Sequence, residues 1–166
     1  MQKLIIAIFI VFLFISNSFS QGSSSNNETA IGLQIGYFNF SSGDSHKGAA
    51  EIRPSFHHKY SKTFTLVADF AFCIEKNNDS YSTYNLLALG FKFKPRVNEG
   101  FYLKPGVGFF LAGDNKDGFT PTLDLGFGHD FRISKKFDVF AEAEGYLIFP
   151  YGFAYSISVG SKFKFN

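Results

Sequence analysis

The sequence predicts an all-β protein, a closed antiparallel up-and-down β-barrel of about eight strands and of the transmembrane type, which follows a cleaved N-terminal export signal. Three observations predict this fold. Apolar residues alternate with polar or small residues along most of the chain, polar turn residues separate eight such runs, and the first residues have the pattern of a secretory signal. The 166 residues have room for one domain of this kind.

The N-terminal segment has the composition of an export signal. A basic start precedes an unbroken apolar run over residues 4–15, and small residues surround an expected cleavage site after Ser20. The apolar run is too short for a membrane-spanning helix, which needs about 20 residues. We therefore expect three parts: a signal peptide over residues 1–20, a flexible leader over 21–28 and a barrel over 29–166.

The eight runs have the two-residue period of β-strands, and none has the three-to-four spacing of a helix. The gaps between them contain Gly, Asn, Asp, Ser, Pro and Lys, which are residues typical of hairpin turns. The predicted strands are 30–40, 49–60, 63–75, 82–94, 100–112, 119–132, 137–149 and 152–165.

Alternation alone is compatible with an apolar exterior or with an apolar lumen. An eight-stranded barrel holds only its own side chains or one small ligand, and the apolar faces carry on the order of forty residues. The polar faces mix charges with glycines, which suits a narrow interior. We therefore expect the polar face inside, with charges on Glu51, Arg53, Lys59, Asp69, Glu75, Lys92, Lys94, Lys104, Asp124, Asp130, Arg132, Asp138, Glu142, Glu144, Lys162 and Lys164.

Positive and negative residues are equal in number in that predicted lumen, so we expect paired charges and bound water rather than an open pore. The whole chain is also nearly balanced, with 16 Lys and Arg against 14 Asp and Glu, which argues against a nucleic-acid partner. Cys73 is the only cysteine, so an intramolecular disulfide and a site of several thiolates are both excluded.

Candidate reaction chemistry is weak in this sequence. His57 and His58 are adjacent and would point to opposite faces of a strand, which argues against a shared metal site. Paired carboxylates among the lumen residues are better explained by ion pairs with lysines and arginines than by acid-base catalysis. No Ser, His and Asp triad can be assembled with any specificity. We therefore expect that the protein is not an enzyme and that it binds neither a cofactor nor a metal.

The final strand carries a pattern of a polar residue, a glycine and two aromatics at Ser158, Gly160, Phe163 and Phe165. In this the chain resembles the small outer-membrane β-barrels of Gram-negative bacteria, including the OmpA and OmpX type and the barrel domains of Bacteroidota. The resemblance covers residues 29–166. It implies that these four residues are an assembly signal read by the barrel assembly machinery, that both termini face the periplasm, and that the protein contacts outer-membrane lipid.

Together these expectations describe a non-enzymatic, monomeric barrel in the bacterial outer membrane, with a role in envelope integrity or surface interaction. A small-ligand carrier is the alternative. It would be either a soluble periplasmic barrel of the lipocalin type or a membrane barrel that passes small apolar molecules.

Overall fold

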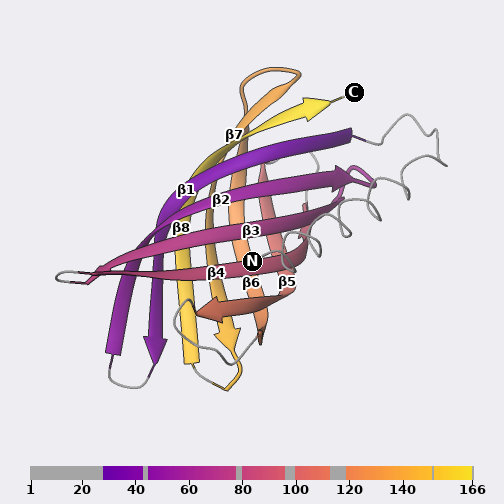
Figure 1. The fold of residues 1–166 in the computed structure, drawn as a ribbon. Helices are drawn as coiled ribbons and strands as arrows, with labels where there is room; N and C mark the ends of the chain where they lie inside the picture. The colour runs from indigo at the N-terminus through magenta and orange to yellow at the C-terminus, as the bar shows by residue number, and fades with distance from the viewer. Residues whose placement is uncertain are drawn as a thin grey trace.

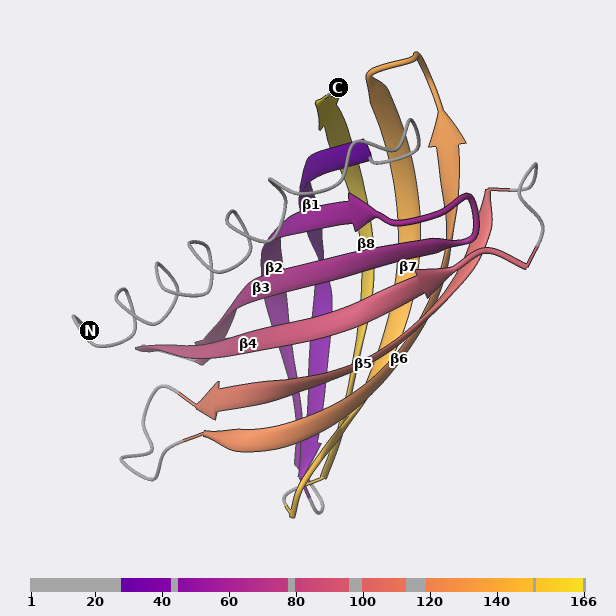
Figure 2. The ribbon, with the colours of Figure 1, turned by 90° about the vertical axis from the view of Figure 1, so that its right-hand side faces the viewer.

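The computed structural model describes residues 28–42, 45–77, 80–95, 100–112, 119–150 and 152–165. These residues form eight strands, drawn in Figures 1 and 2. The predicted signal peptide, and the predicted leader up to residue 27, lie outside the described residues. The strands are β1 (Glu28–Ser42), β2 (Ser45–Lys59), β3 (Phe64–Asn77), β4 (Ser80–Phe93), β5 (Phe101–Ala112), β6 (Thr120–Arg132), β7 (Phe137–Ile148) and β8 (Gly152–Phe165).

The strands close into one barrel, which confirms the predicted fold. Each strand pairs antiparallel with the next along the chain, and β1 pairs with β8 from Thr29 opposite Phe165 to Ser41 opposite Phe153. The strands have 12 to 15 residues, more than the 9 to 11 that a tilted strand needs to cross a bilayer. Closure leaves no unpaired edge, as backbone in a hydrocarbon environment requires.

The predicted strand boundaries differ most at the first hairpin. We predicted that the second strand begins at residue 49, whereas β2 begins at Ser45, opposite Ser42 of β1. Polar residues there suggested a long turn, but the antiparallel ladder continues through them, since polar side chains at a strand end can still reach water. The hairpins from β3 to β4 and from β7 to β8 are also short.

Two of the three prolines inside the described strands coincide with gaps in the ladder. The recorded pairing of β2 with β3 passes from Ile52 to Ser55 and omits the residues around Pro54. The pairing of β4 with β5 likewise omits Pro105. Proline has no backbone N–H to donate, so a local gap in the ladder is the expected consequence. The register is the same on both sides of each gap, so neither proline shifts the faces of its strand.

The exterior of the barrel is apolar. Among the described residues, 32 large hydrophobic side chains are exposed, for example Leu125 at 61% and Ile157 at 59%. Lys76, at the end of β3, is the one Asp, Glu, Lys or Arg on the outward positions of the described strands. A soluble monomer does not expose an apolar band of this extent, so the predicted orientation is confirmed and the soluble lipocalin-type alternative is wrong.

The barrel has two distinct ends, which Figures 1 and 2 show. One end holds the start of β1, the end of β8 and the β2–β3, β4–β5 and β6–β7 connections, and we call it the terminal end. The other end holds the remaining four connections and is called the hairpin end. In the described part of the chain there is no helix with the length and apolar character needed to cross a membrane.

Candidate functional site in the barrel lumen

The lumen contains three layers, and their order follows from positions along the strands. On β2, Ala49 lies toward the hairpin end, Arg53 in the middle and His57 toward the terminal end. Residues two apart on a strand share a face, so one strand contributes a side chain to each layer. We call the layers the aromatic plug, the ionic network and the basic vestibule.

The ionic network fills the middle of the barrel and consists of Glu51, Arg53, Asp69, Tyr102, Lys104, Glu142, Glu144, Tyr146 and Ser156, all buried. Its first centre is the guanidinium of Arg53. This group donates to Glu51, Glu142 and Glu144, and also to the hydroxyls of Tyr146 and Ser156, the last at 3.1 Å. The planar guanidinium, with five N–H donors, is suited to link several acceptors in this way.

Lys104 of β5 is the second centre of the network. Its ammonium lies 2.7 Å from a carboxylate oxygen of Asp69, 2.7 Å from Glu142 and 2.9 Å from Glu144. Tyr102 donates to Glu142 at 2.7 Å. The network therefore joins side chains from β2, β3, β5, β7 and β8 across the lumen, which confirms for this layer the expectation that charges inside would be paired.

A metal ion at this point is disfavoured by the same geometry. Oxygen atoms of Asp69, Glu142 and Glu144 lie within 4.8 Å of one another, as metal ligands would. Lys104 contacts all three of these carboxylates, and Arg53 contacts two of them. The positive charge that the carboxylates need is thus supplied by the protein itself, and the cluster is best described as an ion-pair network.

The aromatic plug closes the lumen toward the hairpin end and was not predicted. It consists of Phe38, Ala49, Ala71, Cys73, Tyr84, Leu86, Phe110, Tyr146, Ile148 and Ala154, with Phe40 packed against them. Phe110 stacks on Phe38 with ring centroids 6.4 Å apart, on Phe40 at 5.3 Å and on Tyr84 at 5.8 Å. The prediction of a lumen filled by charges is therefore wrong for this layer. Strict alternation places these residues on the inward face, but their apolar character suggested the lipid-facing side.

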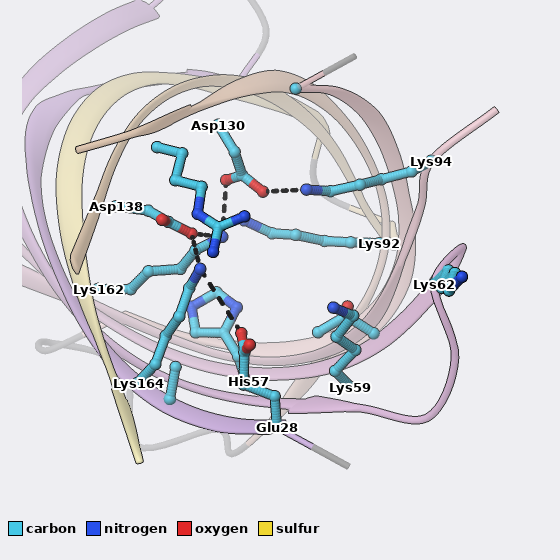
Figure 3. A pocket seen from close by; sticks show the side chains of 14 residues that line it. Glu28, His57, Lys59, Lys62, Lys92, Lys94, Asp130, Asp138, Lys162 and Lys164 are labelled. Atoms are coloured by element: carbon cyan, nitrogen blue, oxygen red, sulfur yellow. Dashed lines mark ion pairs between the residues drawn. The ribbon is translucent and has the colours of Figure 1, made fainter. Parts of the chain in front are cut away.

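The basic vestibule is a cavity of about 350 Å³ at the terminal end, seen in Figure 3. Its charged lining residues are Lys59, Lys62, Lys92, Lys94, Arg132, Lys162 and Lys164 together with Glu28, Asp130 and Asp138. Asp130 pairs with Lys94 at 2.6 Å and with Lys162 at 2.8 Å, and Asp138 pairs with Lys164 at 2.8 Å. These ion pairs belong to the predicted lumen set, but they form a layer separate from the Arg53 network.

Lys92 connects the vestibule to the ionic network. Its ammonium lies 3.3 Å from Glu142, 4.0 Å from the ring centroid of Tyr102 and 4.5 Å from that of Phe140. Cation–π contacts of this kind stabilise a desolvated ammonium. The rings were not among the predicted lumen residues, although their spacing on the strands places them on the inward face.

Some predicted lumen residues belong neither to the central network nor to the ion pairs of the vestibule. Arg132 is exposed at the end of β6, where it lines the vestibule without an ion pair to any described residue. Asp124 is buried, yet it makes neither an ion pair nor a hydrogen bond within the described part of the chain. Glu75 lies near the plug and accepts a hydrogen bond from Tyr84. Strand parity gives the face of a residue but not its height or its partner.

Glycines on the inward face make room for these large side chains. A Cβ placed on Gly128 would lie 2.5 Å from the hydroxyl of Tyr102 and 2.5 Å from a backbone oxygen of Ala141. A Cβ on Gly106 would lie 2.1 Å from a carboxylate oxygen of Asp124. The mixture of glycines and charges that predicted the inward face is therefore a packing requirement of the narrow lumen.

The two adjacent histidines have different surroundings. The ring of His57 faces the lumen, where its Nε2 lies 2.9 Å from the hydroxyl of Ser55. His58 lies on the opposite side of the strand, 3.2 Å from the hydroxyl of Thr29 and edge-on to Tyr60. The two rings do not share a site. Nδ1 of His57 has no hydrogen-bond partner in the described residues, so Ser55 and His57 lack the acid of a catalytic triad.

The predicted assembly-signal residues of β8 lie on both faces. Ser158 points inward and donates to the side chain of Gln34 at 2.8 Å, and Gly160 packs beside the same side chain. Phe163 and Phe165 are exposed on the outside, with ring centroids 5.3 Å apart. The two aromatics therefore lie at the terminal end of the apolar exterior.

No protein-family model matches the chain, and no curated relative matches it in sequence. Solved structures do match its fold. Neisserial surface protein A superposes with a TM-score of 0.61 at 16% identity, covering 87% of this chain and 100% of the other. Ail of Yersinia pestis superposes with a TM-score of 0.65 at 15% identity, covering 84% of this chain and 99% of the other. The N-terminal barrel of Pseudomonas aeruginosa OprF superposes with a TM-score of 0.59 at 17% identity, covering 84% of this chain and 98% of the other.

These likenesses confirm the fold expected from the resemblance to small outer-membrane barrels. Ail is described as an outer-membrane protein, and designed transmembrane β-barrels also match, with a TM-score of 0.51. The chain thus has the fold of the bacterial outer-membrane β-barrel proteins, and its largely apolar exterior fits the membrane in which that class resides.

Proposed function

We propose that this protein is a sealed, non-enzymatic outer-membrane barrel that contributes to envelope integrity or surface interaction. The observation that carries the proposal is the double closure of the lumen. The aromatic plug fills one end, and the ionic network crosses the middle with buried side chains from five strands. A path for ions or solutes would have to break both layers.

The absence of enzymatic activity is also part of the proposal. The acids that would serve as general acid or base, chiefly Glu142 and Glu144, are each held by Arg53 and Lys104. A catalytic group must be free to exchange a proton with a substrate within hydrogen-bond reach. These carboxylates instead serve as fixed acceptors between strands.

The proposed biogenesis follows from the resemblance and from the outward apolar face. After removal of residues 1–20, the barrel assembly machinery would recognise Ser158, Gly160, Phe163 and Phe165, and the folded protein would have outer-membrane lipid as its partner. We expect a monomer, because each strand edge is already paired within one chain.

Conductance and permeability measurements test the sealed-barrel proposal. The purified full barrel in a planar lipid bilayer should give no stepwise current, whereas a general porin measured in parallel should conduct. In cells, loss of the protein should increase sensitivity to detergent and to large antibiotics, and the wild-type chain should restore resistance.

A variant tests whether the ionic network seals the lumen without an intact aromatic plug. Phe110→Ala removes the ring shared by three aromatic contacts but leaves the ionic network in place, so it should still not conduct. Steady single-channel currents from the wild-type barrel would refute the sealed lumen. Unchanged envelope sensitivity after deletion would refute the integrity role and leave surface interaction as the remaining role.

A further inference from the structure

We propose that the basic vestibule is a binding site for a phosphate-bearing anion. The site is distinct from the sealed layers above it, because it opens at the terminal end of the barrel (Figure 3). The proposal does not depend on the envelope role: a sealed barrel can bind an anion at its mouth, and the vestibule could do so in a barrel with another role.

The first argument is an imbalance of charge. Seven Lys and Arg side chains line the cavity, against three carboxylates. The carboxylates are already engaged, since Asp130 lies between Lys94 and Lys162, while Asp138 and Glu28 both lie near Lys164, at 2.8 and 3.7 Å. The excess positive charge is confined by a low-dielectric protein wall, which strengthens its field in the cavity.

The second argument is the presence of unused donors. The ammonium of Lys92 is 1% exposed in its side chain, where it lies 3.3 Å from Glu142 and over the rings of Tyr102 and Phe140, but none of its N–H groups makes a hydrogen bond of good geometry to a described residue. Nδ1 of His57 is likewise buried without a partner in the described residues, and it is a donor in the tautomer whose Nε2 accepts from Ser55. Figure 3 shows both side chains directed into the space between the lysines. Buried donors without acceptors are costly, and an anion in this space would supply the acceptors.

The third argument is that further cations at the rim are unpaired. Lys59, Lys62 and Arg132 line the cavity, and none has a carboxylate at ion-pair distance among the described residues. A single surface cation would be unremarkable, but three of them share one opening with the buried donors. All three line the same cavity as Lys92 and His57.

The chemistry of the ligand follows from these donors. The volume of about 350 Å³ lies at the lower end of small-ligand sites, so a small anion fits better than a polymer. Several cations around one space favour a multivalent oxyanion, and phosphate offers more acceptor oxygens and more charge than a carboxylate. The phosphate group could come from a soluble molecule or from a lipid headgroup beside the rim.

Titration with inorganic phosphate tests the site. The full barrel is refolded in octyl glucoside, an uncharged detergent without phosphate, and binding is followed by calorimetry and by backbone amide shifts at constant ionic strength. We expect saturable binding, with shifts at His57 and its neighbours and none in the aromatic plug. Chloride at the same ionic strength should give no saturable shift.

Two variants and a matched control give the test its specificity. Lys92→Gln should weaken phosphate binding about tenfold or more, since it removes a buried charged donor. Because a buried lysine can affect folding, the double variant Lys62→Gln with Arg132→Gln removes two unpaired rim charges and should weaken binding about tenfold. Lys135→Gln removes an exposed charge from the β6–β7 turn outside the cavity and should leave the affinity unchanged.

The source of the phosphate is resolved by repeating the titration in phospholipid nanodiscs. Equal affinity in nanodiscs and octyl glucoside indicates a soluble ligand, and loss of binding only in nanodiscs indicates that a headgroup occupies the site. Absence of saturable binding in both media overturns the proposal. An equal loss in Lys135→Gln and in the rim double variant also overturns it, because binding would then reflect overall charge.

Discussion

Removal of the Arg53 side chain should be among the most damaging single changes in the barrel. Arg53→Met keeps much of the volume and the apolar stem but deletes a guanidinium that donates to three carboxylates and two hydroxyls. Glu142 and Glu144 would stay buried with Lys104 as a cation, whereas Glu51 would stay buried with the hydroxyl of Ser156 and no cation among the described residues.

The expected magnitude follows from the burial of both partners. Arg53 and the carboxylates it contacts are at most 1% exposed in their side chains, so water cannot replace the lost charge. Breaking a buried ion pair by removing one partner costs about 3 to 5 kcal/mol. We expect the free energy of unfolding of Arg53→Met to fall by that amount.

Urea unfolding of the refolded barrel in lipid vesicles measures this change. The chain has eight Tyr and no Trp, so far-UV circular dichroism and the gel mobility of unheated samples are suitable probes. Arg132→Met is the matched control, because Arg132 is exposed and makes no ion pair with a described residue, and it should cost less than about 1 kcal/mol. Equal unfolding free energies for Arg53→Met and Arg132→Met would show that the ion pairs of Arg53 do not stabilise the folded barrel.

Three further predictions address the exterior, the packing and the assembly. Leu125→Arg places a charge on the outward face and should lower the unfolding free energy in vesicles by about 2 to 4 kcal/mol, whereas Asp124→Asn on the inward face should cost less. Normal assembly of Leu125→Arg would contradict the outward orientation of Leu125. Gly128→Ala should cost about 1 to 3 kcal/mol in the same assay, because its Cβ would lie 2.5 Å from a backbone oxygen of β7; wild-type stability would show that the lumen has spare room. Phe165→Ala should slow insertion into liposomes that contain the barrel assembly machinery. Phe153→Ala, which is equally outward but at the other end of β8, should insert at the wild-type rate. Equal insertion rates for the two variants would argue against an assembly signal at the end of β8.

The architecture was predictable because its physical cause is local in sequence. A two-residue period fixes the face of each side chain, so the outward position of Leu125 and the inward position of Asp124 can be deduced without coordinates. Partners across the lumen depend instead on the shear and radius of the closed barrel. Nothing near Arg53 in sequence indicates that it contacts Tyr146, and nothing near Asp124 indicates that it makes no hydrogen bond or ion pair with a described residue.

The aromatic plug was missed for a different reason. Residues such as Phe38 and Phe110 follow the inward parity of Gly36 and Gly108, two positions away on the same strands, but they are apolar. By residue type alone, a phenylalanine is expected on the lipid-facing side, whereas strand parity places these two in the lumen. Parity determines the face, because a strand cannot turn one side chain to the other face without a bulge.

The layered lumen also explains why a costly buried network is retained where apolar packing would serve stability equally well. The outward face of this barrel is apolar along most of each strand, so a strand shifted by two residues would still meet lipid with apolar side chains. The inward face is not uniform: a two-residue shift of β2 would move Arg53 into the plug or into the vestibule, away from Glu142 and Glu144. An unpaired buried charge is strongly unfavourable, so the network selects one register among several that the exterior would accept.

Replacing Arg53, Glu142 and Glu144 together by apolar residues should therefore preserve stability better than Arg53→Met alone. The same triple variant should show more than one set of amide resonances, because several registers would then be populated. A triple variant with one sharp set of resonances would show that register is fixed elsewhere.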